Sequence, residues 1–310
     1  MPTPIVLDCD PGHDDAIALL LALVTDDLTV EAVTTVAGNQ TLEKTTRNAR
    51  QVLTVADRTD ILVAAGCDRP LIRKLRTAGS VHGESGLDGP ALPEPAAPLH
   101  DDHGVSVLIE TIETANTPVT LVPTGPLTNV ALAFTLKPEL TEAIEEVVLM
   151  GGGYAEGNVT PAAEFNILAD PEAASIVFDA DVPVTMVGLD VTRAGRLPTE
   201  RFEDFRGMDN RIGPLVAELL DFYVAYHRDQ FGWDAVPIHD ACAVAHVIDS
   251  SILDTERMHV AVETAGTHTV GETVCDRWGV TNNEPNAEVA LDINAERFHE
   301  LLRDAMGRYC

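Results

Sequence analysis

Residues 5–23 read IVLDCDPGHDDAIALLLAL, and this stretch decides how the whole chain is interpreted. The apolar run at residues 5–7 predicts a buried β-strand, and the spacing of apolar residues over 16–23 predicts a helix. Between the two lie four carboxylates, Asp8, Asp10, Asp14 and Asp15. Carboxylates this close repel one another unless protons or a cation neutralise them. The stretch therefore predicts a bound divalent metal ion.

Asp10 and Asp15 are the first candidates for the metal ligands, and Asp8 lies near them in the sequence. A hard cation such as calcium takes about six to eight oxygen ligands from carboxylates, carbonyls and waters. The alternative is that these acids occupy the start of a helix because the helix dipole favours negative charge there. That alternative accounts for Asp14 or Asp15 but not for four acids together.

The charge of the chain excludes some classes of partner. The formal net charge is −30, and the only lysines are Lys44, Lys74 and Lys137. Nucleic acid or an anionic membrane is not expected as a partner, because phosphate groups are bound by basic patches. An acidic, lysine-poor composition also suggests adaptation to high salt, which screens the self-repulsion, and therefore a halophilic source.

The cysteines and the N-terminus indicate a compartment. The five cysteines are widely spaced and include no CxxC pair, so free thiols in a reducing compartment are expected. The N-terminus has no signal-peptide pattern, and no apolar run reaches the length of a membrane span. We therefore predict a soluble cytoplasmic protein.

Strand-like and helical patterns alternate along most of the chain. Strands are expected at 28–38, 61–65, 119–124, 147–150 and 184–189, and helices at 41–56, 105–115, 127–136, 171–178, 215–228, 241–248 and 295–307. This order predicts an α/β fold with an open, mostly parallel, Rossmann-like sheet covered by helices on both faces. Residues 258–274 are expected to form a small antiparallel β insertion. We expect one domain over residues 1–310.

Polar residues follow the predicted strands, where open parallel sheets bind their ligands. Asn39, Thr124, residues 151–153 and Asp190 all come directly after such strands, and we expect them to meet Asp10 at one crevice. The irregular segment 79–104 contains His82, His100 and His103. Long irregular segments inside a compact domain are often functional.

Two further groups of residues are suited to chemistry. His239 precedes Asp240, and a histidine of near-neutral pKa beside a carboxylate can act as a general acid. The alternative is that Asp240 caps a helix beside an exposed histidine. The segment Glu164, Phe165 and Asn166 follows Asn158 and is suited to binding hydroxyl groups, or is a polar loop before a helix.

Several motifs together resemble one known family. Residues 8–18 fit the pattern DxDxGxDDAxA, which resembles the opening of the inosine–uridine-preferring nucleoside hydrolases, a family of purine and pyrimidine ribonucleoside N-ribohydrolases. The same family order continues in TTVAGNQ (34–40), AAGCD (64–68), HGESG (82–86), LVPTGPLTN (121–129), VVLMGGGY (147–154), AEFN (163–166) and His239–Asp240. The resemblance spans nearly the whole chain.

The resemblance implies a calcium-dependent enzyme that cleaves the N-glycosidic bond of ribonucleosides to give free base and ribose. By resemblance, Ca²⁺ is held by Asp10, Asp15, the main-chain carbonyl of Thr124 and Asp240. Asp10 is also expected to be the general base that takes a proton from the attacking water, and His239 to be the proton donor to the leaving base. A homodimer or homotetramer is the expected assembly.

The resemblance also implies the substrate contacts. Ribose hydroxyls near C2′ and C3′ are expected to bind Asp14, Asn39 and Asn166, and the 5′-hydroxyl to bind Asn158 and Glu164. Met150 is expected to line the ribose pocket, His82 to lie on a loop over the base, and Phe165 to contact the substrate.

One departure from the family concerns the base. Members that accept purines often carry two tyrosines one helical turn apart, where this chain has Tyr223 and His227. Tyr223 fits that pattern and His227 does not, so His227 is expected to stack on the base or donate a proton to it. The alternative is that both residues lie on a mobile surface helix.

Two other classes of function remain open from the residues. An aspartyl-phosphate phosphatase also places a DxD motif after its first strand, but it requires a distal lysine that is hard to find here. A calcium-dependent nucleoside- or sugar-binding protein could have the same pocket without turnover, although binding alone needs neither an acid nor a base.

Overall fold

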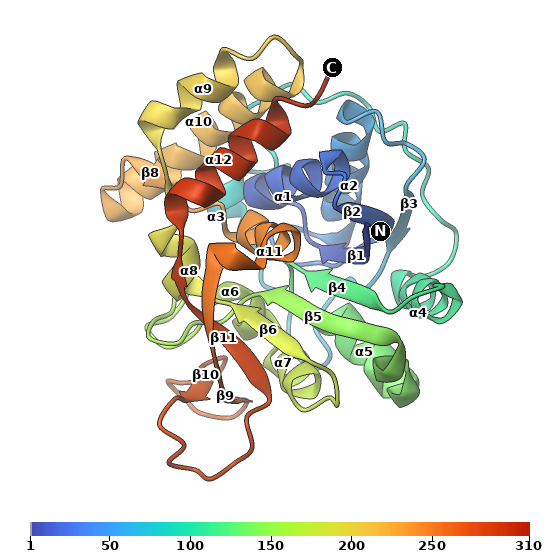
Figure 1. The fold of residues 1–310 in the computed structure, drawn as a ribbon, viewed down its shortest axis with the longest axis vertical. Helices are drawn as coiled ribbons and strands as arrows, with labels where there is room; N and C mark the ends of the chain where they lie inside the picture. The colour runs from blue at the N-terminus through green and yellow to red at the C-terminus, as the bar shows by residue number, and fades with distance from the viewer. Residues whose placement is uncertain (1) are drawn as a thin grey trace.

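A nine-stranded sheet runs through the molecule (Figure 1). In this computed structural model, which describes residues 2–310, the strand order is β10-β9-β11-β6-β5-β4-β1-β2-β3. The strands are β1 Thr3–Cys9, β2 Leu28–Thr35, β3 Leu62–Ala65, β4 Val119–Pro123, β5 Ile144–Met150, β6 Val184–Val187, β9 Leu253–Val262, β10 Thr273–Asp276 and β11 Ala287–Ile293. Strands β7 Leu197–Pro198 and β8 Ala235–Val236 form a separate antiparallel pair.

Helices cover both faces of the sheet, as the sequence predicted. They are α1 His13–Val24, α2 Leu42–Val55, α3 Gly79–His82, α4 Gly104–Thr114, α5 Thr128–Leu136, α6 Phe165–Ala169, α7 Pro171–Phe178, α8 Leu189–Ala194, α9 Phe202–Arg206, α10 Ile212–Phe231, α11 His239–Ile248 and α12 Ala295–Met306. Short 3₁₀ turns lie at Pro138–Ala143, Thr199–Arg201 and Ser250–Ile252.

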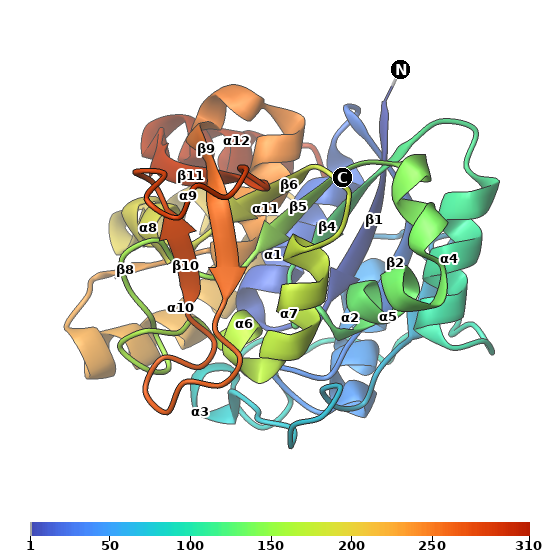
Figure 2. The same cartoon turned by 90° about the horizontal axis from the view of Figure 1, so that it is seen from below.

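Two apolar cores result, one on each face. Buried side chains of α1, α2, α9, α10, α11 and α12 form the first, and those of α4, α5 and α7 form the second. Figure 2 shows α5 and α7 in front of the strands, with α1 on their far side. A two-faced cover of this kind is required because a parallel sheet buries both of its surfaces.

The alternation of side chains along β1 separates the first acids. Ile5, Leu7 and Cys9 belong to the core that contains α1, whereas Val6 belongs to the core that contains α5. Asp8 shares the face of Val6, because successive side chains of a strand point to opposite faces. Its Oδ1 accepts hydrogen bonds from Thr34 Oγ1 (2.6 Å) and from Asn129 Nδ2 of α5 (2.7 Å). Asp8 is therefore directed away from the acids of α1.

The mostly parallel sheet is confirmed, with two differences in detail. The second strand ends at Thr35 rather than at residue 38, and Asn39 then donates its backbone N–H to Asp10 Oδ2. The antiparallel segment was expected as an insertion, but β9 pairs with both β10 and β11 and so extends the main sheet at its edge. Strand β11 pairs in parallel with β6, which joins this segment to the rest of the sheet.

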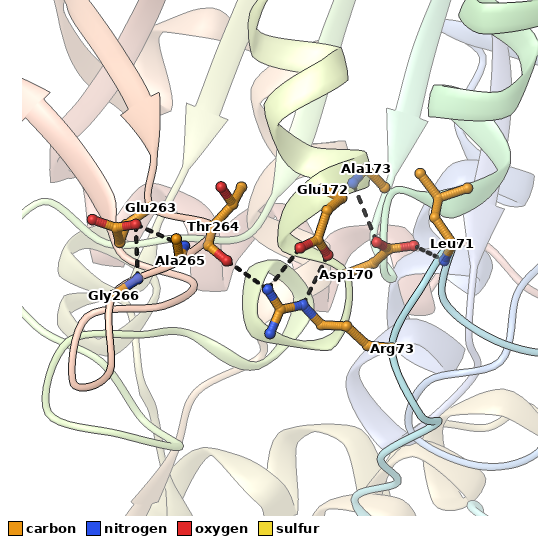
Figure 3. Close-up of polar contacts among 9 residues, drawn as sticks. All are labelled: Leu71, Arg73, Asp170, Glu172, Ala173, Glu263, Thr264, Ala265 and Gly266. Atoms are coloured by element: carbon orange, nitrogen blue, oxygen red, sulfur yellow. Dashed lines mark hydrogen bonds and ion pairs between the residues drawn. The ribbon is translucent and has the colours of Figure 1, made fainter.

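The long connection between β3 and α4 contains only the short helix α3 and is anchored by polar contacts (Figure 3). Arg73 donates to both carboxylate oxygens of Glu172 (2.8 and 2.6 Å) and to the carbonyl of Thr264 (2.7 Å). Asp170 accepts from the backbone N–H of Leu71 (2.8 Å). These bonds tie the segment that leads into α3 to helix α7 and to the loop after β9.

Two simpler expectations can be compared with the structure. Within residues 2–310 no helix combines the length and the apolarity that a membrane crossing requires. All five cysteines are free thiols, as predicted.

Candidate active site

A cavity of about 370 Å³ opens at the carboxyl ends of the parallel strands. Asn39, Thr124 and Met150 lie at or just beyond the ends of β2, β4 and β5 and line it. This is the position that the topology of an open parallel sheet predicts for a ligand. Every residue to which the family resemblance assigned a role, apart from Asp10 and Asp15, lines this cavity.

The floor of the cavity is acidic. Asp14, Asp15 and Asp240 each offer a carboxylate oxygen, and these oxygens lie within 4.8 Å of one another. Asp10 is not a member of this group of three within the described chain, but it lies close enough to Asp15 for that charge to raise its pKa. All four carboxylates are buried, so the sheet edge brings together acids from β1, α1 and α11.

Asp15 holds the floor together by hydrogen bonds. Its Oδ2 accepts from the backbone N–H of Gly12 (3.0 Å) and from Asn39 Nδ2 (3.3 Å). Its Oδ1 accepts from Thr124 Oγ1 (2.8 Å). Asp15 therefore satisfies the start of α1, as the helix-terminus alternative predicted, and also faces the other acids.

Asp10 lies between two glycine backbones. A Cβ built at Gly38 would lie 2.0 Å from Asp10 Oδ2, and one built at Gly125 would lie 2.7 Å from Asp10 Oδ1. Both distances are shorter than any real contact, so each position requires glycine for this close approach of backbone to carboxylate. Asp10 Oδ2 accepts from Asn39, while its Oδ1 is buried without a hydrogen-bond partner.

The charge balance of the floor is incomplete without a cation. Burial, and then the neighbouring carboxylates, raise the pKa of Asp10 and of Asp240 well above the usual range, and that of Asp14 to about 8. Burial also raises the pKa of Asp15, so each of the four carboxylates is costly to ionise in the absence of a cation. None of the ion pairs within residues 2–310 involves any of the four.

A hard divalent cation fits this donor set. Asp10 Oδ1 and Asp14 Oδ1 are buried carboxylate oxygens without hydrogen-bond partners, and such orphaned acceptors are uncommon in native interiors. The donors are all oxygens, which calcium and magnesium prefer. The main-chain carbonyl of Thr124 accepts one bond from Asn166 Nδ2 (2.8 Å), and a carbonyl has a second lone pair for another partner.

The α6 region faces the floor from the other side. Glu164 Oε2 accepts from the backbone N–H groups of Gly152 (3.0 Å) and Ile167 (3.2 Å), which caps α6 and holds the glycines after β5. Asn166 donates to the carbonyl of Met150 (3.1 Å) as well as to that of Thr124. Glu164 and Asn166 are thereby presented to the cavity from one short helix.

His239 begins α11, and Asp240 is its second residue. The cap of this helix is Ile238, so Asp240 is not a helix cap and its carboxylate belongs to the acidic floor. His239 Nδ1 lies 2.7 Å from Thr192 Oγ1. Burial, with smaller contributions from His227 and Arg193, lowers the pKa of His239 to about 3, below the near-neutral pKa that suits a general acid.

Aromatic rings and histidines form the wall opposite the floor. Tyr223 and His227 are 2% and 4% exposed and meet edge to face with ring centres 4.5 Å apart. His82 stacks on Tyr223 at 5.4 Å, and Tyr223 Oη lies 3.5 Å from Asp14 Oδ2. Both helix residues therefore face the cavity, and the surface-helix alternative is wrong.

Several lining residues were missed from the sequence. Tyr226 and Phe231 lie on the same helix as Tyr223 and His227, at spacings that the helical period could have revealed. Arg193 and Trp233 also line the cavity, but they come from α8 and from the loop after α10. No local sequence pattern marks Arg193 and Trp233 as cavity residues, because only the tertiary structure brings them to the cavity.

Some residues expected at the crevice have other roles. The Asp190 carboxylate accepts from the backbone N–H groups of Tyr154 (2.5 Å) and Ala155 (3.1 Å) and so supports the loop after β5 rather than lining the cavity. His103 caps α4 by accepting from Val105 N–H (3.2 Å). His100 accepts from Asp102 N–H (3.1 Å) in the same segment.

Comparison with known proteins agrees with this geometry. The chain is 49% identical over 310 residues to the pyrimidine-specific ribonucleoside hydrolase RihA of Photobacterium profundum, and 50% identical to RihA of Escherichia coli O127:H6. Both matches cover 100% of this chain and 100% of the relative.

Solved structures of nucleoside hydrolases have the same fold. The plant nucleoside hydrolase PpNRh1 superposes with a TM-score of 0.93 at 31% identity and 99% coverage of both chains. A purine-preferring ribonucleoside hydrolase from Gardnerella vaginalis gives a TM-score of 0.93 at 28% identity and 98% coverage of both chains. The model of the inosine-uridine preferring nucleoside hydrolase family matches residues 5–300. Because sequence, fold and pocket agree over almost the full length, this chain belongs to the inosine-uridine preferring nucleoside hydrolase family.

Proposed function

We propose that this ribonucleoside hydrolase depends on Ca²⁺ and that its residues act in the roles that the family resemblance implies. The observation that carries the proposal is the buried acidic floor, with its unpartnered Asp10 and Asp14 oxygens, inside a cavity that also presents amides, a carboxylate and histidines. A cavity of about 370 Å³ is within the range of small-molecule sites, about 300–1,000 Å³.

The cation would be held by Asp10, Asp15, Asp240 and the carbonyl of Thr124. The geometry adds Asp14 as a further oxygen donor, since its carboxylate lies in the same group as those of Asp15 and Asp240. When bound, a divalent cation lowers the pKa of water and stabilises negative charge as a Lewis acid.

The proposed chemistry of the chain itself begins with Asp10. Its unpartnered Oδ1 is the group suited to accept a proton from water attacking the anomeric carbon of the ribose. Cleavage of a glycosidic bond passes through an oxocarbenium-like ribose, and contacts with the ribose hydroxyls strengthen as that charge develops. Asp14, Asn39 and Asn166 are proposed to make those contacts, and each of them lines the cavity.

His239 is proposed to place a proton on the leaving base. Its imidazole is neutral in the free protein, because burial lowers its pKa to about 3. The ring therefore has to take up a proton from solvent before it can act as an acid, and negative charge that develops on the departing base favours this uptake by raising the pKa of His239. The proton then passes to the base and leaves the imidazole neutral again. The contact with Thr192 Oγ1 fixes the ring, which leaves Nε2 as the nitrogen available to the base.

Uridine and cytidine are the proposed preferred substrates. The support comes from the relatives at 49% and 50% identity, which are described as pyrimidine-specific. Tyr223 favours purines by resemblance, and His227 departs from that pattern. The two residues share one wall of the cavity with His82, so the base is proposed to lie against all three.

The two rival functions differ from this proposal in different ways. Within residues 2–310 no lysine lines the cavity, so the lysine of an aspartyl-phosphate phosphatase has no counterpart there. A nucleoside-binding protein without turnover differs only in releasing no ribose.

Domain organisation, compartment and assembly are also proposed. A single domain is favoured because β1–β3 and β9–β11, from opposite ends of the chain, share one sheet. The cytoplasm is favoured by the five free thiols. A homodimer or homotetramer stays a prediction from the resemblance.

The substrate class is tested by ribose release. Wild-type protein is incubated with uridine, cytidine, inosine and adenosine, and free ribose is measured; we expect turnover, fastest with the pyrimidine nucleosides.

The role of Asp10 is tested by substitution. Asp10→Asn keeps the side-chain shape and the acceptor for Asn39 N–H but loses the base, so kcat should fall at least ~100-fold. Asp26→Asn, at an exposed acid, is the control. Binding without ribose release would favour the binding protein, and Asp10→Asn at more than a few per cent of the rate would exclude Asp10 as base.

Calcium is tested by stability as well as by activity. A ligand at 100 times its Kd stabilises the native state by about 2.7 kcal/mol, so protein stripped with EGTA should melt at a higher temperature when calcium is added back. Asp240→Asn should lose most of this shift, because it removes one negative charge from the floor. Full activity in the stripped protein, with no bound metal by elemental analysis, would contradict the proposal.

The role of His227 is tested by base preference. His227→Tyr restores the second tyrosine of the purine-accepting pattern, so the ratio of inosine to uridine kcat/KM should rise. His268→Tyr, at an exposed histidine outside the cavity, is the matched control. An unchanged ratio would remove His227 from the residues that set base preference.

Adaptation to high salt is proposed from the charge of −30. Self-repulsion is screened over about 3 Å at 1 M salt but over about 30 Å at 0.01 M. The melting temperature should therefore be higher in about 1 M than in about 0.01 M potassium chloride, with calcium held constant in both. Equal melting temperatures would argue against the adaptation.

A further inference from the structure

Helix α8 supports the loop after β5 through two side chains of opposite charge. Asp190 and Arg193 are three residues apart on this helix, a spacing that puts them on one face. The Asp190 carboxylate accepts from the N–H groups of Tyr154 and Ala155. Arg193 binds the next two residues: its Nη1 lies 2.6 Å from Glu156 Oε1, and its Nη2 donates to the carbonyl of Gly157 (3.2 Å).

The Arg193 contacts are sheltered from solvent. The side chain of Arg193 is only 13% exposed, although that of Glu156 is 51% exposed. An ion pair to an exposed carboxylate contributes little by itself, but a guanidinium that also bonds a backbone carbonyl fixes the path of the chain. Arg193 also lines the cavity, so the support is built into its wall.

The supported residues lead directly into Asn158. A compact turn follows, in which Gly157 N–H donates to Pro161 O (3.2 Å) and Asn158 N–H donates to Ala163 O (3.1 Å). A Cβ at Gly157 would lie 2.2 Å from the carbonyl oxygen of Thr160, so the turn closes tightly on itself. The contacts of Arg193 with Glu156 and Gly157 connect the start of this turn to α8.

We propose that Arg193 is a positioning residue that holds Asn158 in place to bind the 5′ end of the ribose. This inference rests on the proposed function, in which Asn158 meets the 5′-hydroxyl. Arg193 makes no contact with the reacting atoms in this assignment. Its effect passes through Glu156 and Gly157 to the residue that follows them.

The proposal is tested with a pair of substrates. Arg193→Ala is assayed on uridine and on 5′-deoxyuridine, which lacks the hydroxyl that Asn158 is proposed to bind. For uridine, kcat/KM should fall about tenfold, which corresponds to about 1.4 kcal/mol. For 5′-deoxyuridine it should stay within about twofold of the wild-type value, because the lost contact is one that this substrate never makes.

Matched variants separate positioning from general damage. Arg201→Ala removes another arginine that pairs with a glutamate at 2.6 Å, but Arg201 does not line the cavity. This variant should leave kcat/KM unchanged for both substrates. Glu156→Gln should lower kcat/KM for uridine less than Arg193→Ala does, because the hydrogen bond from Arg193 to the Gly157 carbonyl remains. Arg193→Lys should recover only part of the uridine rate, since lysine cannot span both acceptors as a planar guanidinium does.

A second readout does not depend on turnover. Hydrogen exchange of the backbone amides of residues 157–160 should be faster in Arg193→Ala than in the wild type and unchanged in Arg201→Ala. Equal losses on both substrates, no loss on either, or unchanged exchange in the turn would each overturn the role of Arg193. If the proposed function is wrong, wild-type protein releases no ribose from any nucleoside. In that case the hydrogen exchange of residues 157–160 still decides whether Arg193 holds this turn in place.

Discussion

The mutual repulsion of buried carboxylates is the constraint on which the site depends. Asp10, Asp14, Asp15 and Asp240 lie at one edge of the sheet, and burial raises the pKa of each. A fold built for stability alone would not place four acids there, because each must give up its hydration. The arrangement is understandable if a cation occupies their centre, since it supplies the charge that no lysine or arginine provides within the described chain.

The backbone around these acids is arranged to bring them close. Gly38 and Gly125 let two loops approach Asp10 from either side, and Asp15 takes its hydrogen bonds from Gly12, Asn39 and Thr124. The loops after β1, β2 and β4 therefore converge through contacts with these carboxylates. The parallel topology makes this possible, because it gathers the carboxyl ends of these strands at one edge.

Polar contacts around the cavity hold its walls in place. Arg73 and Asp170 anchor the segment before α3 to α7 (Figure 3). Helix α3 contains His82, which stacks on Tyr223 in the aromatic wall. Helix α8 supports the opposite side, where Thr192 contacts His239 and Arg193 binds the loop that contains Asn158. The wall proposed to meet the base and the loop proposed to bind the ribose are thereby supported by separate parts of the fold.

The amino-acid sequence by itself determined the fold class and most of the site, because those features are local. Neighbouring residues are enough to reveal the spacing of apolar side chains in β1 and α1, the glycines at strand ends and the acids at the start of a helix. The tertiary structure alone decided that Asp8 faces the opposite core, that Asp190 supports a loop, that the pKa of His239 is far below neutral, and that Arg193 and Trp233 reach the cavity. The physical reason is that burial and long-range contacts set these properties, and neither is encoded within a single segment of the chain.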